Sequence, residues 1–176
     1  MISKPDKDHA KRPSDRPLDA LDRRILSALT KDARQTNAAL GEQVGLSAPA
    51  VHERVKRLRA NGIISRTAAR LDGPSVGKPL LAFVHVDADG WGKSERMMRL
   101  AEFPEVEEMH SVAGDTSVIM KVRAANTLAL EHFLSQLYQL PGIRGTKSFI
   151  ALSTYLDRPV QAEVTMDWPT LHLPPE

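Results

Sequence analysis

The segment from Ser47 to Ala60 combines the start signals of a helix with a dense set of basic side chains. Ser47 can cap a helix, and Pro49 fits the first turn, where a missing N–H has no consequence. Four cations follow within the segment, namely Arg54, Lys56, Arg57 and Arg59. Guanidinium and ammonium groups pair with phosphate oxygens, so this helix could bind nucleic acid. The alternative is a solvated basic face on an ordinary three-helix bundle.

A short helix directly before this segment would complete a helix-turn-helix. Thr36 can cap a helix that ends at Val44, and Gly45 suits the left-handed residue that terminates it. In such a unit the second helix enters the major groove, and its N-terminal residues lie nearest the base edges. We therefore expect base contacts near the start of the second helix and phosphate contacts from its cations. The predicted DNA-contacting residues are Thr36, Ser47, Ala48, Pro49, Ala50, His52, Arg54, Lys56, Arg57 and Arg59.

The surrounding sequence predicts a winged helix-turn-helix domain over residues 18–71. Apolar residues at helix spacing predict a first helix that begins at Leu18. The inward stripe of the third helix consists of Val51, Val55 and Leu58. The segment Ile63–Leu71 is expected to be a strand in the wing position, and residues 72–79 a linker rich in turn residues.

A second domain is expected over residues 80–157. Its predicted order is βαββαβ, with strands at Leu80–Val86, Val106–Val112, Val118–Val122 and Lys147–Tyr155 and helices at Ser94–Phe103 and Asn126–Leu140. This order predicts a ferredoxin-like α+β fold, an antiparallel sheet with both helices on one face. The other face would expose residues such as Phe83 and Ile150, which predicts subunit association. Residues 1–17 are expected to be a flexible tail, and residues 158–176 a tail or a strap across a partner.

The charges are distributed unevenly along the chain. Formal charges sum to +5 between Leu18 and Arg70 and to −5 from Leu71 to the C-terminus. This asymmetry predicts a polyanionic partner for the N-terminal part only. The sequence contains no cysteine and no apolar run of membrane-spanning length, so we expect a cytoplasmic protein.

Catalytic and metal-binding functions find little support in the residue types. The six histidines are scattered: His9, His52, His85, His110, His132 and His172. None forms a closely spaced ligand pair on one helix, and no cysteine is present, so no metal site and no cofactor are predicted. Asp87–Gly90 resembles the start of a calcium loop but lacks the rest of the ligand pattern, so a turn is expected. We predict that the protein is not an enzyme.

Several segments resemble the leucine-responsive and asparagine-responsive (Lrp/AsnC) transcription regulators. In the N-terminal part these are Leu21–Leu26, Gly45–Val51 and Arg54–Leu58, and in the C-terminal part Leu81–Val84, Phe103–Val106, Ala113–Asp115, Lys121–Arg123 and Leu140–Ile143. The resemblance implies a winged helix-turn-helix followed by an effector domain that dimerises. It also implies further assembly into tetramers or octamers and an amino-acid effector bound between effector domains. Two DNA-binding heads about 34 Å apart would recognise a pseudo-palindromic site.

The resemblance also points to an effector site. The residues it implies are Val112, Gly114, Asp115, Thr116, Ser117, Ser148 and Ile150. Family members commonly carry a second acidic residue and an aromatic around this turn, whereas this chain has Ser117 and Thr116. From the residues alone, Gly114-Asp115 is equally explained as a hairpin turn.

The leading hypothesis is a sequence-specific DNA-binding transcriptional regulator that responds to an amino acid or a related small metabolite. Double-stranded DNA, a second copy of the chain and a small amino acid are the expected partners, with no membrane. The runner-up is an architectural, weakly selective DNA-binding protein. A ferredoxin-like enzyme and a metabolite-binding module that controls another protein are the remaining alternatives.

Overall fold

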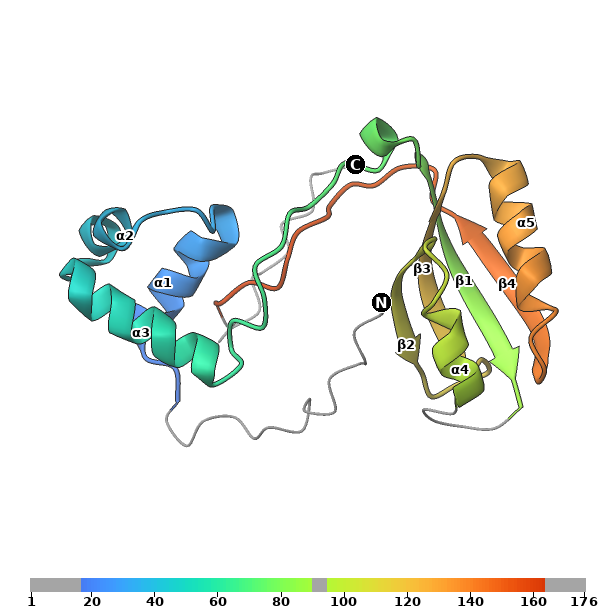
Figure 1. Ribbon diagram of the computed structural model, residues 1–176, viewed down its shortest axis with the longest axis horizontal. Helices are drawn as coiled ribbons and strands as arrows, with labels where there is room; N and C mark the ends of the chain where they lie inside the picture. The colour runs from blue at the N-terminus through green and yellow to red at the C-terminus, as the bar shows by residue number, and fades with distance from the viewer. Residues whose placement is uncertain (1–16, 90–94, 164–176) are drawn as a thin grey trace, which may run out of the picture. The chain divides into compact units, whose positions relative to one another are not determined.

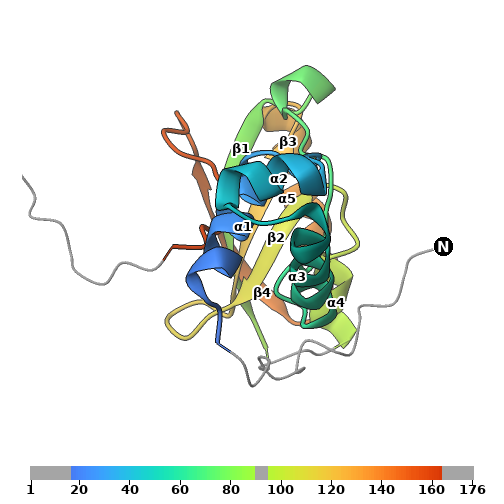
Figure 2. The same cartoon turned by 90° about the vertical axis from the view of Figure 1, so that its left-hand side faces the viewer.

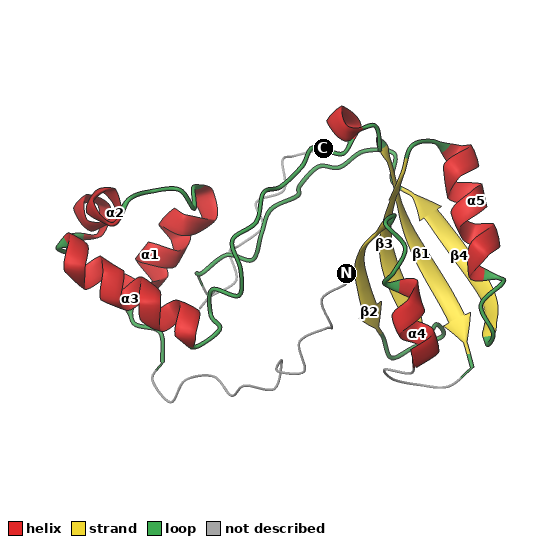
Figure 3. Ribbon diagram, viewed as in Figure 1, coloured by secondary structure: helices red, strands yellow, loops and turns green. Residues whose placement is uncertain are grey.

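The structure, a computed structural model, describes residues 17–89 and 95–163. Its contacts divide the chain into two compact units. Of the described residues, 17–68 and 157–163 form the helical unit, and those between 69 and 156 form the α+β unit. Figure 1 traces both units, and Figure 3 shows that every described strand belongs to the α+β unit. Within the described ranges, no helix is long and apolar enough to span a membrane.

The described residues of the helical unit form three helices (Figure 2). Each helix begins with a side-chain cap. They are α1 (Ala20–Lys31), α2 (Asn37–Val44) and α3 (Ala48–Ala60). The hydroxyl of Thr36 accepts a hydrogen bond from the Ala39 amide at 3.2 Å, and the hydroxyl of Ser47 accepts one from the Ala50 amide at 3.4 Å. Both predicted caps are confirmed. Helices α2 and α3 therefore begin directly after the capping residues that the sequence predicted.

The turn between α2 and α3 depends on two glycines. Gly45 adopts the left-handed conformation (φ 73°) that the sequence predicted for it. Gly41 is buried within α2, and the Leu46 amide donates to its carbonyl at 2.9 Å. A Cβ at Gly41 would collide with the Leu46 carbonyl oxygen. No role was predicted for Gly41, yet its lack of a side chain lets the turn lie this close to α2.

The predicted wing strand is not formed. No strand occurs over Ile63–Leu71, and nearly all of these described residues are exposed. A strand requires a neighbouring strand for its backbone hydrogen bonds, and none of the described strands pairs with this segment. Only Ile64 packs on the helical core. The end of α3 is as predicted, because Gly62 is left-handed (φ 70°) and two amides after it return to the Leu58 carbonyl.

The α+β unit has the predicted βαββαβ order. Its elements are β1 (Leu80–Ala88), α4 (Glu95–Leu100), β2 (Val106–Ser111), β3 (Val118–Ala124), α5 (Thr127–Leu137) and β4 (Ile143–Ile150). The sheet order is β2-β3-β1-β4 with every pair antiparallel, which confirms the ferredoxin-like fold. Strand β4 begins and ends earlier than predicted, and a 3₁₀ turn (Pro74–Val76) lies in the predicted linker. The predicted start of α4 at Ser94 falls outside the described residues.

One face of the sheet carries the core, and both helices contribute to it. Val84 and Met120 lie on this face with Leu100 of α4 and Phe133 of α5, all buried. The opposite face exposes Phe83 (41 %) and Phe149 (45 %), which are cross-strand partners. The prediction for Phe83 is thus confirmed. Ile150 is also exposed, at 48 %, but the face predicted for it is wrong. Ile150 pairs with the buried Ala82, so the register places it on the helix-covered side at the edge strand.

The described C-terminal segment, residues 157–163, contacts α1 of its own chain. The Arg23 guanidinium donates to the Ala162 carbonyl at 2.6 Å. A hydrogen bond with Ser27 lowers the pKa of Glu163 below its usual value. This part of the chain therefore belongs to the helical unit, whereas residues 164–176 lie outside the described range.

Candidate nucleic-acid interface

The basic residues of α3 fall on two sides of its buried stripe. Val51, Val55 and Leu58 face the core. At about 100° per residue, His52, Lys56 and Arg59 lie to one side of this stripe, and Arg54 and Arg57 to the other. The first three side chains are exposed, whereas Arg54 and Arg57 are only partly exposed. The two sides therefore differ in what their charges can reach.

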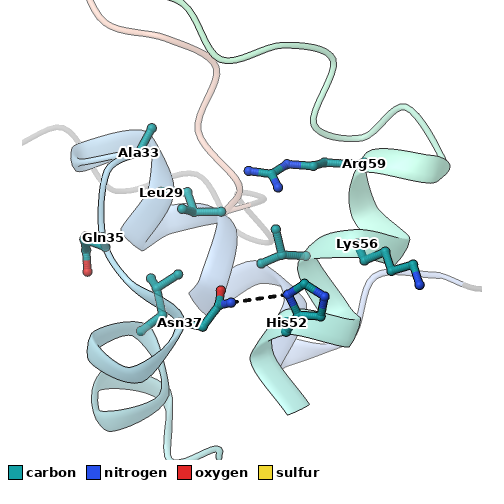
Figure 4. Close-up of a pocket in the computed structure, with 9 residues that line it drawn as sticks. Leu29, Ala33, Gln35, Asn37, His52, Lys56 and Arg59 are labelled. Atoms are coloured by element: carbon teal, nitrogen blue, oxygen red, sulfur yellow. Dashed lines mark hydrogen bonds between the residues drawn. The ribbon is translucent and has the colours of Figure 1, made fainter. Parts of the chain in front are cut away.

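The exposed side borders a hollow of about 210 Å³ between the three helices (Figure 4). The residues that line it are Leu29, Ala33, Gln35, Asn37, Leu40, His52, Val55, Lys56 and Arg59. The Asn37 amide nitrogen lies 3.4 Å from Nδ1 of His52, which connects the start of α2 to α3. In Figure 4 the Arg59 guanidinium extends from α3 over the hollow, whereas the Lys56 side chain borders it and its ammonium points away. Polar groups of α2 and α3 and one guanidinium thus surround this hollow.

On the other side, Arg54 and Arg57 form ion pairs with the first turn of α1. Arg54 Nη1 contacts Asp19 Oδ2 at 2.7 Å and Asp22 Oδ1 at 2.8 Å. Arg57 Nη2 contacts Asp22 Oδ1 at 2.6 Å. We call Asp19, Asp22, Arg54 and Arg57 the α1–α3 network. The sequence predicted that both arginines bind phosphates, and this stays a prediction. Their carboxylate partners were not predicted.

Electrostatic stabilisation in the α1–α3 network is mutual. Hydrogen bonds from the Arg54 side chain and the Asp22 backbone hold the pKa of Asp19 below its usual value. The same carboxylates, Asp19 first and then Asp22, raise the pKa of Arg54. Both groups are therefore charged over the physiological range. The signal available in the sequence was the three-residue spacing within each pair, which places both members on one helix face.

The start of α3 presents small and polar groups. Ser47 and Pro49 are exposed, while Ala48 and Ala50 are half-buried. The cap hydroxyls of Ser47 and Thr36 accept from backbone amides, and each hydroxyl proton can still donate to a phosphate oxygen. The structure thus brings the cap hydroxyls and the exposed side of α3 into one helix-turn-helix.

The predicted effector loop uses most of its polar side chains internally. The Thr116 hydroxyl donates to the Val86 carbonyl at 2.9 Å. The Ser117 hydroxyl donates to the Ala88 carbonyl at 3.2 Å and accepts from the Ala88 amide at 3.3 Å. Asp115 is exposed at the tip beside Gly114. Its carboxylate is therefore the polar side chain of this turn that can meet a ligand.

The two predicted pocket residues on β4 lie at different distances from this loop. Ser148 pairs with Val84 and Ile150 with Ala82, whereas Ser117 binds the Val86 backbone. From Val86 to Ala82 the strand spans about 13 Å. Val112 is half-buried, and its amide closes the turn by donating to the Ser117 carbonyl at 3.2 Å. Within one α+β unit, Ile150 is thus not brought to the loop.

The helix-free face of the sheet carries a second set of ion pairs beside the two phenylalanines. Lys121 contacts Glu108 at 3.2 Å and Glu107 at 3.4 Å, and Arg123 contacts Glu107 at 2.7 Å. We call these four residues the sheet-face network. Burial opposes the charge of Lys121, but the two carboxylates outweigh it and raise the pKa of its ammonium group. This face is therefore apolar at one part and charged at another.

The histidines that the structure describes do not form a metal site. The His85 ring packs at a tilt of 56° against Phe149, with ring centroids 5.0 Å apart, and His110 lies 3.4 Å from a Glu108 oxygen. Among the described residues, no group of three or more His, Asp or Glu side chains is placed to hold a metal ion. His9 and His172 lie outside the described range.

Two family models match the chain, one in each part of the sequence. Residues 18–59 match the AsnC-type helix-turn-helix domain. Residues 81–161 match the Lrp/AsnC ligand binding domain. The first match contains α1, α2 and most of α3, and the second contains the sheet except for Leu80, the first residue of β1. The matches therefore cover the fold elements that carry both candidate sites.

Characterised relatives match over most of their own length. The chain is 38 % identical over 143 residues to the HTH-type transcriptional regulator LrpA of Mycobacterium tuberculosis, covering 80 % of this chain and 95 % of the relative. It is 32 % identical over 149 residues to the leucine-responsive regulatory protein of Escherichia coli, covering 82 % and 90 %. A transcriptional regulator from Neisseria meningitidis, solved in complex with L-methionine, superposes with a TM-score of 0.73 at 28 % identity, covering 81 % and 94 %.

Proposed function

The chain belongs to the Lrp/AsnC family of transcriptional regulators, and we propose that it recognises specific DNA sequences through α3 and responds to an amino acid. This family is not enzymatic. The observation that carries the proposal is the exposed side of α3, where His52, Lys56 and Arg59 lie on one helix side and border a hollow shared with Asn37 of α2. Cations and hydrogen-bond donors on one helix face are what a major groove and its phosphates require.

In this proposal the exposed side of α3 divides its tasks by position. Lys56 and Arg59 pair with phosphates, and they supply affinity without sequence choice. His52 and the residues at the helix start contact base edges, because the N-terminal part of the helix lies deepest in the groove. The cap hydroxyls of Thr36 and Ser47 donate to the phosphate backbone.

The test is equilibrium binding of the full chain to duplex DNA at several salt concentrations. The logarithm of the association constant should fall linearly with the logarithm of the salt concentration. Lys56→Ala should reduce the magnitude of this slope by about 1. His52→Ala should instead change the preferred sequence. An affinity that does not depend on salt would refute DNA binding through these cations.

We propose that two chains associate through the helix-free face of the sheet. Phe83 and Phe149 are large apolar side chains on this face, and covering them would remove apolar surface from water. The sheet-face network would form the polar part of the same interface. Phe83→Glu should therefore dissociate the dimer in analytical ultracentrifugation, and an unchanged mass would refute this interface. The same runs establish whether dimers assemble further into tetramers or octamers.

The proposed effector is an amino acid bound near Gly114-Asp115. The complex of the Neisseria relative with L-methionine supports an amino acid as the ligand class. Asp115 can pair with its ammonium group. A thermal-shift screen with each of the twenty amino acids should reveal a selective rise in melting temperature, which Asp115→Asn removes. If no amino acid raises the melting temperature, the protein is a ligand-independent regulator.

A further inference from the structure

Asp22 is the one charged residue that is buried among those the structure describes, and its side chain is 3 % exposed where it meets Arg54 and Arg57 of α3. Burying a carboxylate is unfavourable unless it is paired, and a carboxylate also repels the phosphates of DNA. Phosphate binding by Arg54 and Arg57 gives no reason for this placement. The buried charge therefore requires a different explanation.

The capping box of α1 fixes both carboxylates of the α1–α3 network. The Asp22 amide donates to Asp19 Oδ1 at 2.7 Å, and the Asp19 amide donates to Asp22 Oδ2 at 3.4 Å. Asp19 and Asp22 thus bond to each other's backbone as well as to the arginines. Their positions follow from the first turn of α1 and not from flexible side chains.

The arginines transfer this fixed position to α3. Arg54 and Arg57 are three residues apart, and each guanidinium contacts the same Asp22 oxygen. Two contacts one helical turn apart determine how far α3 is rotated about its own axis. A rotation by one residue would displace every side chain by about 100°, which would move His52, Lys56 and Arg59 out of the groove.

We propose that Asp19 and Asp22 are positioning residues for DNA recognition, holding Arg54 and Arg57 so that α3 presents His52, Lys56 and Arg59 to DNA. Arg54 and Arg57 then act within the protein instead of as phosphate ligands. The side chains of Arg54 and Arg57 are 21 % and 33 % exposed, and moving either to a phosphate would leave Asp22 buried with one cation fewer. The inference rests on the proposed DNA-binding function.

The test compares three variants of the full chain. The probes are a duplex selected from a random pool by the wild-type protein and a scrambled duplex of equal length. Asp22→Asn should weaken binding to the selected duplex by about tenfold and to the scrambled duplex far less, because no cation on the exposed side is lost. Arg57→Ala should weaken binding to the two duplexes in the same way, and it should leave the dependence of affinity on salt concentration unchanged. Lys56→Ala is the matched control and should reduce the slope of this dependence by about 1.

Two results would overturn the positioning role. One is an Asp22→Asn variant that binds both duplexes as tightly as the wild type, or more tightly. The other is an Arg57→Ala variant that reduces the salt slope as Lys56→Ala does, which would make Arg57 a phosphate ligand. The double variant Asp22→Asn with Arg57→Ala should bind the selected duplex like either single variant, and additive losses would also contradict the proposal.

Folding and function are separated by two further measurements. Circular dichroism shows whether Asp22→Asn keeps the helical spectrum of the wild type. If it does not, Asp19→Asn, at the more exposed end of the network, replaces it. The same loss of affinity is expected for Asp19→Asn, and the same results would overturn the proposal. A wild-type protein that selects no duplex from the pool would refute the proposed function itself. If the wild type selects a duplex and the variants discriminate between the two duplexes as well as the wild type does, only the positioning role of Asp19 and Asp22 is refuted.

Discussion

Each unit of the molecule pairs two carboxylates with two cations, but the two sets differ in what they join. The α1–α3 network connects two helices, and the Asp22 side chain is 3 % exposed. The sheet-face network connects β2 to β3, and the carboxylates of Glu107 and Glu108 are 35 % and 52 % exposed. Strands β2 and β3 are already joined by backbone hydrogen bonds, whereas α1 and α3 are not. Only the first network can therefore determine the orientation of a whole element.

The largest expected difference is in stability. Asp22→Ala should lower the free energy of unfolding by about 3 kcal/mol, because it leaves Arg57 without its carboxylate partner, leaves Arg54 with Asp19 alone and breaks the capping box of α1. Glu108→Ala is the matched control in the sheet-face network and should change it by less than about 1 kcal/mol. Chemical denaturation followed by circular dichroism measures both. Equal losses would mean that the two networks are equivalent.

A smaller effect is expected at the turn that positions α3. Gly41→Ala should lower the free energy of unfolding by about 2 kcal/mol, because the new methyl group meets the Leu46 carbonyl oxygen. Gly145→Ala in β4 is the control, since a Cβ there meets no atom within 4 Å. Calorimetry of both variants should show a lower melting temperature for Gly41→Ala alone. Wild-type stability of that variant would show that the turn has room to adjust.

The smallest expected effect is the pH dependence of the two networks. The pKa of Asp19 is lowered from 3.8, mainly by Arg54, so the stability it contributes is present above pH 3.8 and is lost as the pH falls through the folded value. Lys121 likewise lowers the pKa of Glu108 from 4.5, so that contribution is lost below pH 4.5. Below pH 3.8, the melting temperature of Asp19→Asn should therefore fall less with decreasing pH than that of the wild type. The exposed Asp115→Asn is the control, and identical curves for both variants would contradict this assignment.

Local signals in the sequence correctly predicted the helices that carry the site. Some features that depend on pairing between distant segments, such as the expected wing strand and the face of Ile150, were not predicted correctly. The caps Thr36 and Ser47 and the left-handed Gly45 depend on neighbours within a few residues, and the structure confirms them. The expected strand Ile63–Leu71 is absent because strand formation depends on a partner that its own residues do not specify. The face of Ile150 was wrong for a similar reason, since register is set across strands.

The partners of charged and hydroxyl side chains were equally hard to predict. Arg54 and Asp19 are 35 positions apart, and nothing within either segment shows that the fold brings them together. Arg54 was assigned to phosphates because it was interpreted from its own helix alone. Thr116 and Ser117 were expected at an effector, yet both bond to the β1 backbone about 30 positions away.

Footprinting of the full chain on long genomic DNA tests the central claim most directly. The account predicts protection confined to a few sites at physiological salt, with protected segments repeating about every 10 base pairs where two α3 helices bind successive major grooves. His52→Ala should change which sites are protected. Uniform protection along the DNA would contradict sequence-specific regulation and favour an architectural protein.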